Sequence, residues 1–99
     1  MHLIQILLPI TVDDPDGGKT LGNVRDTLAE RFGGVTLYRN APAEGLWKDE
    51  GAMEADTIVV AEVMTEHLDR EWWAGYRREM ERLFAQEEIV IRALEMSRI

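Results

Sequence analysis

The stretch that decides the fold lies just past the middle of the chain and reads Asp56-Thr57-Ile58-Val59-Val60-Ala61-Glu62-Val63-Met64. Most of its residues are β-branched or aliphatic, and β-branched side chains favour an extended, pleated backbone. Helix-like sequence precedes and follows it at a distance. We therefore predict a central strand over residues 56–64, with Glu62 as a carboxylate among aliphatic side chains.

Length and composition indicate a single domain over residues 1–99. The formal net charge is -8, and a field of that sign repels phosphate groups. We therefore expect neither nucleic acid nor a membrane as a partner. The chain has no cysteine, which excludes disulfides and thiol chemistry. The apolar run at the N-terminus lacks the preceding basic residues of a signal peptide. We therefore expect a cytoplasmic location.

Periodicity places the remaining elements around the central strand. Residues 3–8 form an apolar run that we expect to be a strand covered on both faces. The other expected elements are a helix over 19–32, a strand over 35–39, a long loop over 40–55, a helix from Asp69 to about Phe84, and a final strand over 88–96. On the second helix, the spacing predicts a core face of Trp72, Tyr76, Met80, Leu83 and Phe84. Trp73 is expected on the polar side, available to a partner.

The order strand, helix, strand, strand, helix, strand predicts a ferredoxin-like α+β fold. In that fold, a four-stranded antiparallel sheet has both helices on one face, with the first and third strands in the middle. The other face of the sheet would then carry several apolar side chains: Leu3, Leu7, Ile58, Val60, Met64 and the nearby Tyr38. A patch of that size in water is unusual for a monomer. We therefore expect a homodimer through this helix-free sheet face.

This arrangement resembles the dimeric α+β barrel superfamily, which includes small monooxygenases, haem proteins and ligand-sensing modules. Two segments, Glu30-Arg31-Phe32-Gly33-Gly34-Val35-Thr36 and Ala41-Pro42-Ala43-Glu44-Gly45-Leu46-Trp47-Lys48, are similar to a family of short bacterial proteins of uncharacterised function. The resemblance extends over nearly the whole chain and implies the fold but no particular chemistry. The only histidines, His2 and His67, lie near predicted strand ends, so we expect no haem or other cofactor.

The parity of the first and third strands places Gln5 and Glu62 together on the helix-free face. A carboxylate there has two interpretations. Glu62 is a general base, assisted by Tyr38, or it is satisfied structurally by Gln5, Tyr38 or an arginine across the dimer. The second interpretation is favoured, because buried polar groups normally have partners.

A second group of residues combines Tyr38, Arg39, Trp47 and Lys48. Aromatic rings beside a cation suit a pocket for an aromatic or carboxylate ligand, and Gln5, Arg39 and Trp47 are therefore candidate ligand-binding residues. For Trp47 the favoured role is that of a lid or a dimer contact. The acidic residues and histidine at positions 66–71 match no metal motif, so no metal is expected.

Three functions follow from these observations. The first is a dimeric binding module for a small apolar organic ligand. The second is a cofactor-independent enzyme, of the monooxygenase or isomerase kind, in which Glu62 is the base and Tyr38 or Arg39 orients the substrate. The third is a structural protein whose sheet face serves only for assembly.

Overall fold

The computed structural model describes residues 1–9, 17–38, 43–49 and 52–99. For 17–18, 43–45, 47–49 and 52–57 it describes the backbone alone. The elements are β1 (His2–Pro9), α1 (Gly17–Phe32), β2 (Thr36–Leu37), β3 (Ala43–Asp49), β4 (Ala52–Thr65), α2 (Arg70–Leu83) and β5 (Ile91–Glu95). Neither helix is long and apolar enough to cross a membrane.

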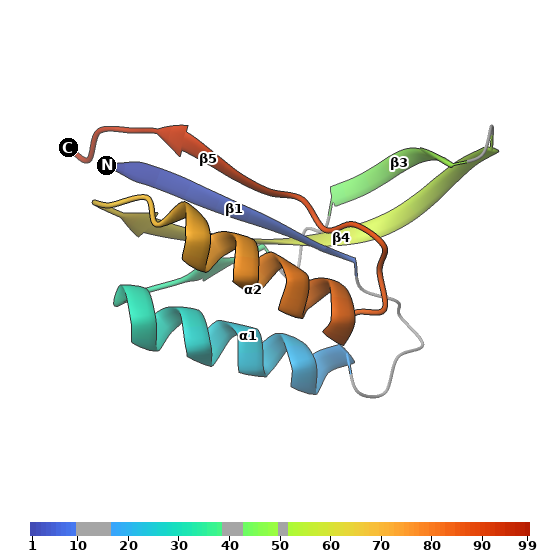
Figure 1. Ribbon diagram of the computed structural model, residues 1–99, viewed down its shortest axis with the longest axis horizontal. Coiled ribbons are helices and arrows are strands. Elements are labelled where there is room, and N and C mark those ends of the chain that lie inside the picture. The colour runs from blue at the N-terminus through green and yellow to red at the C-terminus, as the bar shows by residue number, and fades with distance from the viewer. Residues whose placement is uncertain (10–16, 39–42, 50–51) are drawn as a thin grey trace.

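The strands form one antiparallel sheet in the order β2-β4-β1-β5, with β3 paired to β4 outside that path. Both helices lie on the same side of the sheet, and none of the described residues forms a helix on the opposite side (Figure 1). The two central strands are β1 and β4, as predicted. The ferredoxin-like α+β fold expected from the sequence is therefore confirmed, with one additional strand.

The core lies between the helices and one face of β1 and β4. On β1, the buried side chains are Ile4, Ile6 and Leu8, and α1 contributes Leu21, Val24 and Leu28. These positions recur every second residue on the strand and every third or fourth on the helix, as the geometry of the two elements requires. Val59, Ala61 and Val63 of β4 complete this layer.

The predicted core face of α2 is partly wrong. Its buried residues are Trp73, Tyr76 and Met80, whereas Leu83 is 45% exposed. The spacing 73-76-80 is itself an amphipathic stripe, and it turns Trp73 inward, away from any partner. Trp72 lies at the margin of the core, stacked on Tyr76 at 4.9 Å between ring centroids.

Asp69, where the predicted helix starts, caps α2, because its side chain accepts a hydrogen bond from the Trp72 backbone N–H at 3.0 Å.

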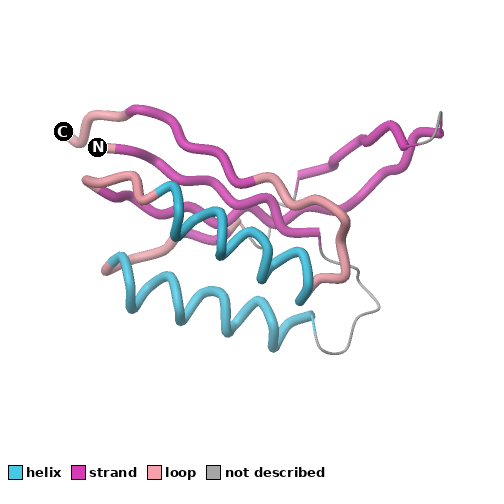
Figure 2. The backbone as a smooth tube through the Cα atoms, in the orientation of Figure 1, coloured by secondary structure: helices cyan, strands magenta, loops and turns pink. Residues whose placement is uncertain are grey.

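The long loop predicted over residues 40–55 is also wrong in the part that the structure describes. β3 and the first part of β4 pair residue by residue, from Ala43 with Ile58 to Asp49 with Ala52. Together they form an arm that projects beyond the two helices (Figure 2). Backbone pairing along β4 overrides the weak strand propensity of this stretch. The missed sequence signal is Glu50-Gly51, a glycine-containing pair between two short runs.

The outer strands are shorter than predicted. β2 is limited to Thr36–Leu37, although the Tyr38 backbone N–H still donates to the Val60 carbonyl at 2.9 Å. β5 covers Ile91–Glu95 of the predicted 88–96. Arg39 lies outside the described residues.

Two glycines allow the backbone of α1 to be tested. A Cβ at Gly22, inside the helix, would meet nothing within 4 Å, and we expect Gly22→Ala to raise the free energy of unfolding by about 0.5–1 kcal/mol. Gly33, just after the helix, has φ +80, a conformation that costs an L-residue roughly 1–2 kcal/mol. Gly33→Ala should therefore destabilise the protein although its Cβ also has open space. Urea denaturation of both variants measures this, and a gain in stability at Gly33 would contradict the assigned helix end.

Candidate functional site

A row of polar side chains crosses the helix-free face of the sheet. Gln5 of β1 lies opposite Glu62 of β4 on one side and Arg92 of β5 on the other. The Gln5 Nε2 donates to Glu62 Oε1 at 2.7 Å, and the Arg92 Nε donates to Gln5 Oε1 at 2.7 Å. Gln5 thus uses both ends of its amide to link β5 to β4.

Tyr38 extends the row beyond β2. Its hydroxyl donates to Glu62 Oε2 at 3.1 Å, so each carboxylate oxygen of Glu62 accepts one side-chain hydrogen bond. This bond and the negative charge of Glu62 raise the pKa of Tyr38, with a smaller contribution from desolvation. The sequence prediction that Gln5, Glu62 and Tyr38 come together is met by the geometry. A carboxylate accepts up to about four bonds, so Glu62 keeps acceptor capacity for a ligand.

The surroundings of this polar row are apolar. Leu3 lies opposite both Met64 and Leu94, and Leu7 lies opposite Val60. Met64 is 45% exposed and Leu94 is 46% exposed. Ile58 is an exception to the predicted patch, because it is buried at 4% exposure, with Pro9 and Ala43 paired on its two sides. The apolar face is therefore present, but it is smaller than the sequence predicted.

A cleft of about 710 Å³ opens at one end of this face. The pairing of β2 with β4 stops at Thr36 and Glu62, so the last residues of β4 have no strand beside them there. The cleft lies in this gap, and its lining residues are Met1, Leu3, Arg31, Phe32, Gly33, Gly34, Val35, Thr36, Glu62, Val63, Met64, Thr65, Glu66 and Arg98. The end of α1, the end of β4 and the C-terminal segment thus meet at one opening.

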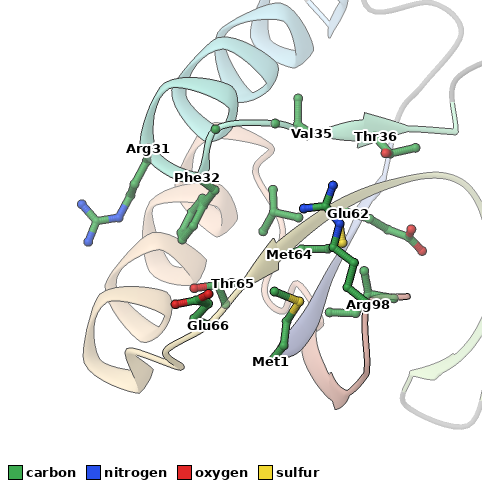
Figure 3. A pocket seen from close by; sticks show the side chains of 14 residues that line it. Met1, Arg31, Phe32, Val35, Thr36, Glu62, Met64, Thr65, Glu66 and Arg98 are labelled. Carbon is green, nitrogen blue, oxygen red and sulfur yellow. The ribbon is translucent and has the colours of Figure 1, made fainter.

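Side chains of opposite character line the cleft. Figure 3 shows Met64 and Arg98 near its middle, between Val35 and Thr36 on one side and Met1 on the other. Arg31 points away from them, and its guanidinium lies 4.2 Å from the Trp72 ring centroid. Gly33 and Gly34 leave open space above their backbone, because a Cβ on either would meet nothing within 4 Å. The cleft therefore offers apolar surface, a guanidinium, a carboxylate and uncovered backbone.

The candidate site differs from the predicted one in two respects. Arg39 lies outside the described residues, and Trp47 is described only by its backbone, which pairs with Glu54 in the arm of β3 and β4. Two arginines take part that the sequence analysis did not select. Arg92 had a usable signal, since strand parity places it beside Gln5, whereas Arg98 follows the last strand and carried none.

The chemistry available to this site is hydrogen bonding, apolar contact and proton transfer. Within the described ranges, no three His, Cys, Asp or Glu residues come together as metal ligands. Two titratable groups, Glu62 and Tyr38, are hydrogen-bonded to each other in the site. Glu62 lines the cleft, whereas Tyr38 does not.

No protein-family model and no curated protein match this chain. Solved structures do match, over 95% or more of its length. The periplasmic divalent cation tolerance protein CutA from Archaeoglobus fulgidus is 23% identical with a TM-score of 0.66, covering 99% of this chain and 86% of its own. The PII-like protein CutA from Nostoc sp. PCC 7120 is 16% identical with a TM-score of 0.59, covering 97% and 81%. A phage SAM lyase is 16% identical with a TM-score of 0.60, covering 95% and 79%.

At these identities, the likeness establishes the fold and leaves the function open. The names of the three proteins differ in kind, since they cover cation tolerance, a PII-like protein and a lyase.

The bond between Tyr38 and Glu62 predicts a difference between the two tyrosines of this chain. Burial first, and then the charge of Glu79, raise the pKa of Tyr76 to about 12. Both tyrosines titrate above their ordinary value of 10.0, so any stability linked to them is present below pH 10 and is lost as the pH rises through their folded pKa values. In Glu62→Gln, the pKa of Tyr38 should fall towards 10.0 while that of Tyr76 stays raised.

A pH titration of ¹³Cζ-labelled tyrosine by NMR measures both values. Glu66→Gln is the matched control, because Glu66 also lines the cleft but makes no bond to Tyr38. An equal fall of the Tyr38 pKa in both variants would contradict the specific bond.

Proposed function

We propose that this protein is a homo-oligomeric binding module that holds a small organic ligand in the cleft beside Glu62. The observation that carries the proposal is the cleft itself, whose volume of about 710 Å³ falls in the range of ligand sites, roughly 300–1,000 Å³. Its lining supports a ligand with an apolar part, against Leu3, Phe32 and Met64. A polar part would meet Thr36, Glu62 or Arg98.

The homo-oligomer is supported by the continuity of the cleft with the helix-free face. Leu3, Glu62 and Met64 belong to both. A second copy laid on this face would cover Leu94 and Met64 and would close the open side of the cleft. A homodimer is the simplest such assembly, since a two-fold interface uses the same patch on both copies. The purely structural alternative has the same interface but an empty cleft.

The enzyme alternative has its own supporting observation. Glu62 is fixed by Gln5 and Tyr38, and positional fixing of a carboxylate at the wall of a cleft suits a general base. A binding module and an enzyme differ in one measurement, because only an enzyme converts the ligand that it binds. Membership of the short bacterial family and the cytoplasmic location stay predictions from the sequence.

Assembly through the helix-free face predicts an asymmetric response to two equally exposed leucines. Leu94 on β5 is 46% exposed and lies on that face, whereas Leu83 on α2 is 45% exposed and lies on a helix. Leu94→Glu should reduce the particle to the mass of one chain, 11.3 kDa, because two carboxylates would be desolvated in the interface. Leu83→Glu should leave the mass unchanged. Sedimentation velocity measures both, and a wild-type particle of 11.3 kDa would contradict the proposal.

If a ligand occupies the cleft, a large side chain at Gly34 should block ligand binding, because Gly34 lines the cleft. Gly34 has open space around its Cβ position and no positive φ, so Gly34→Leu should fold normally and fill the opening. Fragments from a library of small carboxylates, amines and neutral aromatics should shift the amide resonances of Gly33, Gly34 and Val35 in the wild type. They should lose this effect in Gly34→Leu and keep it in Gly22→Leu, whose added side chain is on α1 and outside the cleft. Fragment binding that Gly34→Leu leaves unchanged would exclude this cleft as the site.

A further inference from the structure

A second cavity, of about 250 Å³, lies between α2 and the edge of the sheet at β5. Its lining divides into apolar side chains and arginines, with no acidic residue: Ile4, Leu68, Arg70, Trp73, Ala74, Arg77, Ile91, Arg92 and Ala93. We call this cavity the α2–β5 groove. It shares no lining residue with the cleft beside Glu62.

The charge of this groove is opposite to that of the chain. The protein has 19 acidic and 11 basic residues, yet among the described residues no acidic residue lines the groove. The Arg92 side chain donates to Gln5 on the helix-free face, so the cations of the groove are Arg70 and Arg77. Arg70 and Arg77 are seven residues apart on α2, which places them on the same side of the helix, about 10 Å apart along it. Within the described part of the chain, neither forms an ion pair. The helix wall of the groove therefore presents two cations to a ligand.

The strand wall of the groove presents free backbone groups. Among the described residues, β5 pairs only with β1. Its bonded residues alternate along the strand, as the Leu7 N–H to Val90 carbonyl bond and the Met96 N–H to Met1 carbonyl bond show, both at 3.0 Å. By that alternation, the backbone N–H and C=O groups of Arg92 and Leu94 point towards β1. Ile91 and Ala93 turn their N–H and C=O groups to the outer edge, and both line the groove.

Both walls are held in place before any ligand arrives. Trp73 at the base of the groove is 5% exposed and packs in the core. The Glu81 carboxylate accepts a hydrogen bond from the Ile89 backbone N–H at 3.0 Å, and Ile89, two residues before β5, is 2% exposed. A strand edge fixed in this way loses little further freedom on binding, which favours affinity.

We propose that the α2–β5 groove binds an extended, acidic segment of a partner protein, which adds a strand to β5 and places carboxylates opposite Arg70 and Arg77. A peptide fits better than a small anion, because the edge offers carbonyl acceptors as well as N–H donors and a peptide backbone satisfies both. Alternate side chains of an added strand point to opposite faces of the sheet, so the carboxylates face α2 and the uncharged side chains between them face away from it. The arginines select its charge. This site is independent of the function proposed for the cleft.

The test uses a blocked heptapeptide of alternating valine and glutamate, labelled with a fluorophore, against the full chain. Fluorescence polarisation should show binding that weakens as salt is raised. Affinity should fall at least tenfold for the same peptide with glutamine in place of glutamate, and for the glutamate peptide N-methylated at alternate residues. Amide hydrogen exchange at Ile91 and Ala93 should slow when the peptide is bound.

Protein variants separate the groove from general charge. Arg70→Gln with Arg77→Gln should weaken binding at least tenfold, while Arg78→Gln with Arg82→Gln, on the same helix but outside the lining, should not. Equal losses in the two double variants would overturn the proposal. So would competition by glutarate or inorganic phosphate without protection of Ile91 and Ala93, which would identify a small-anion site. Concentration-dependent protection of these amides without peptide would show that a second copy fills the groove, and would also overturn it.

Discussion

The register between β1 and β4 is the constraint on which the rest of this structure depends. It pairs His2 with Thr65 at one end and Pro9 with Ile58 at the other. Side chains alternate along a strand, so this register buries Ile4 and Ile6 under the helices and directs Gln5 and Glu62 to the opposite face. A slip of one residue would exchange the two sets, exposing the core and burying a carboxylate. The same β1–β4 register therefore determines both the core and the row of polar side chains on the helix-free face.

The two helices cover one face of the sheet and leave the helix-free face open. The polar side chains of that face are hydrogen-bonded within the chain itself. Glu62, Gln5 and Arg92 bond to each other in sequence across three strands, and Tyr38 bonds to the far oxygen of Glu62. A buried polar group that lacks a partner costs roughly 1–3 kcal/mol. Because the bonds named here are made within one chain, this face can be covered by apolar side chains of another copy without leaving Glu62 unpaired.

The sequence predicted what periodicity determines and failed where packing decides. The strand order and the meeting of Gln5 with Glu62 follow from counting residues along β1 and β4, and both were predicted. Trp73 was misplaced because Trp72 and Trp73 each start a plausible stripe on α2, and only contact with the core selects between them. β3 was missed because its stability comes from pairing with β4 rather than from its own sequence. Arg98 joins the cleft through the path of the C-terminal segment, which no pattern encodes.

The cleft and the α2–β5 groove both lie where strand pairing stops. β2 covers only Thr36–Leu37, so the end of β4 is uncovered and the cleft forms beside it. At the opposite margin, β5 has a neighbouring strand on one side only in the part of the chain that the structure describes, and the α2–β5 groove forms there. Within the described residues, the centre of the sheet is occupied by folding contacts, and both proposed ligand sites lie at its margins. The two margins differ in charge, because the cleft mixes carboxylates with arginines while the groove carries arginines without carboxylates. The Arg92–Gln5–Glu62 bonds cross the helix-free face from β5, whose edge borders the groove, to β4, whose Glu62 lines the cleft.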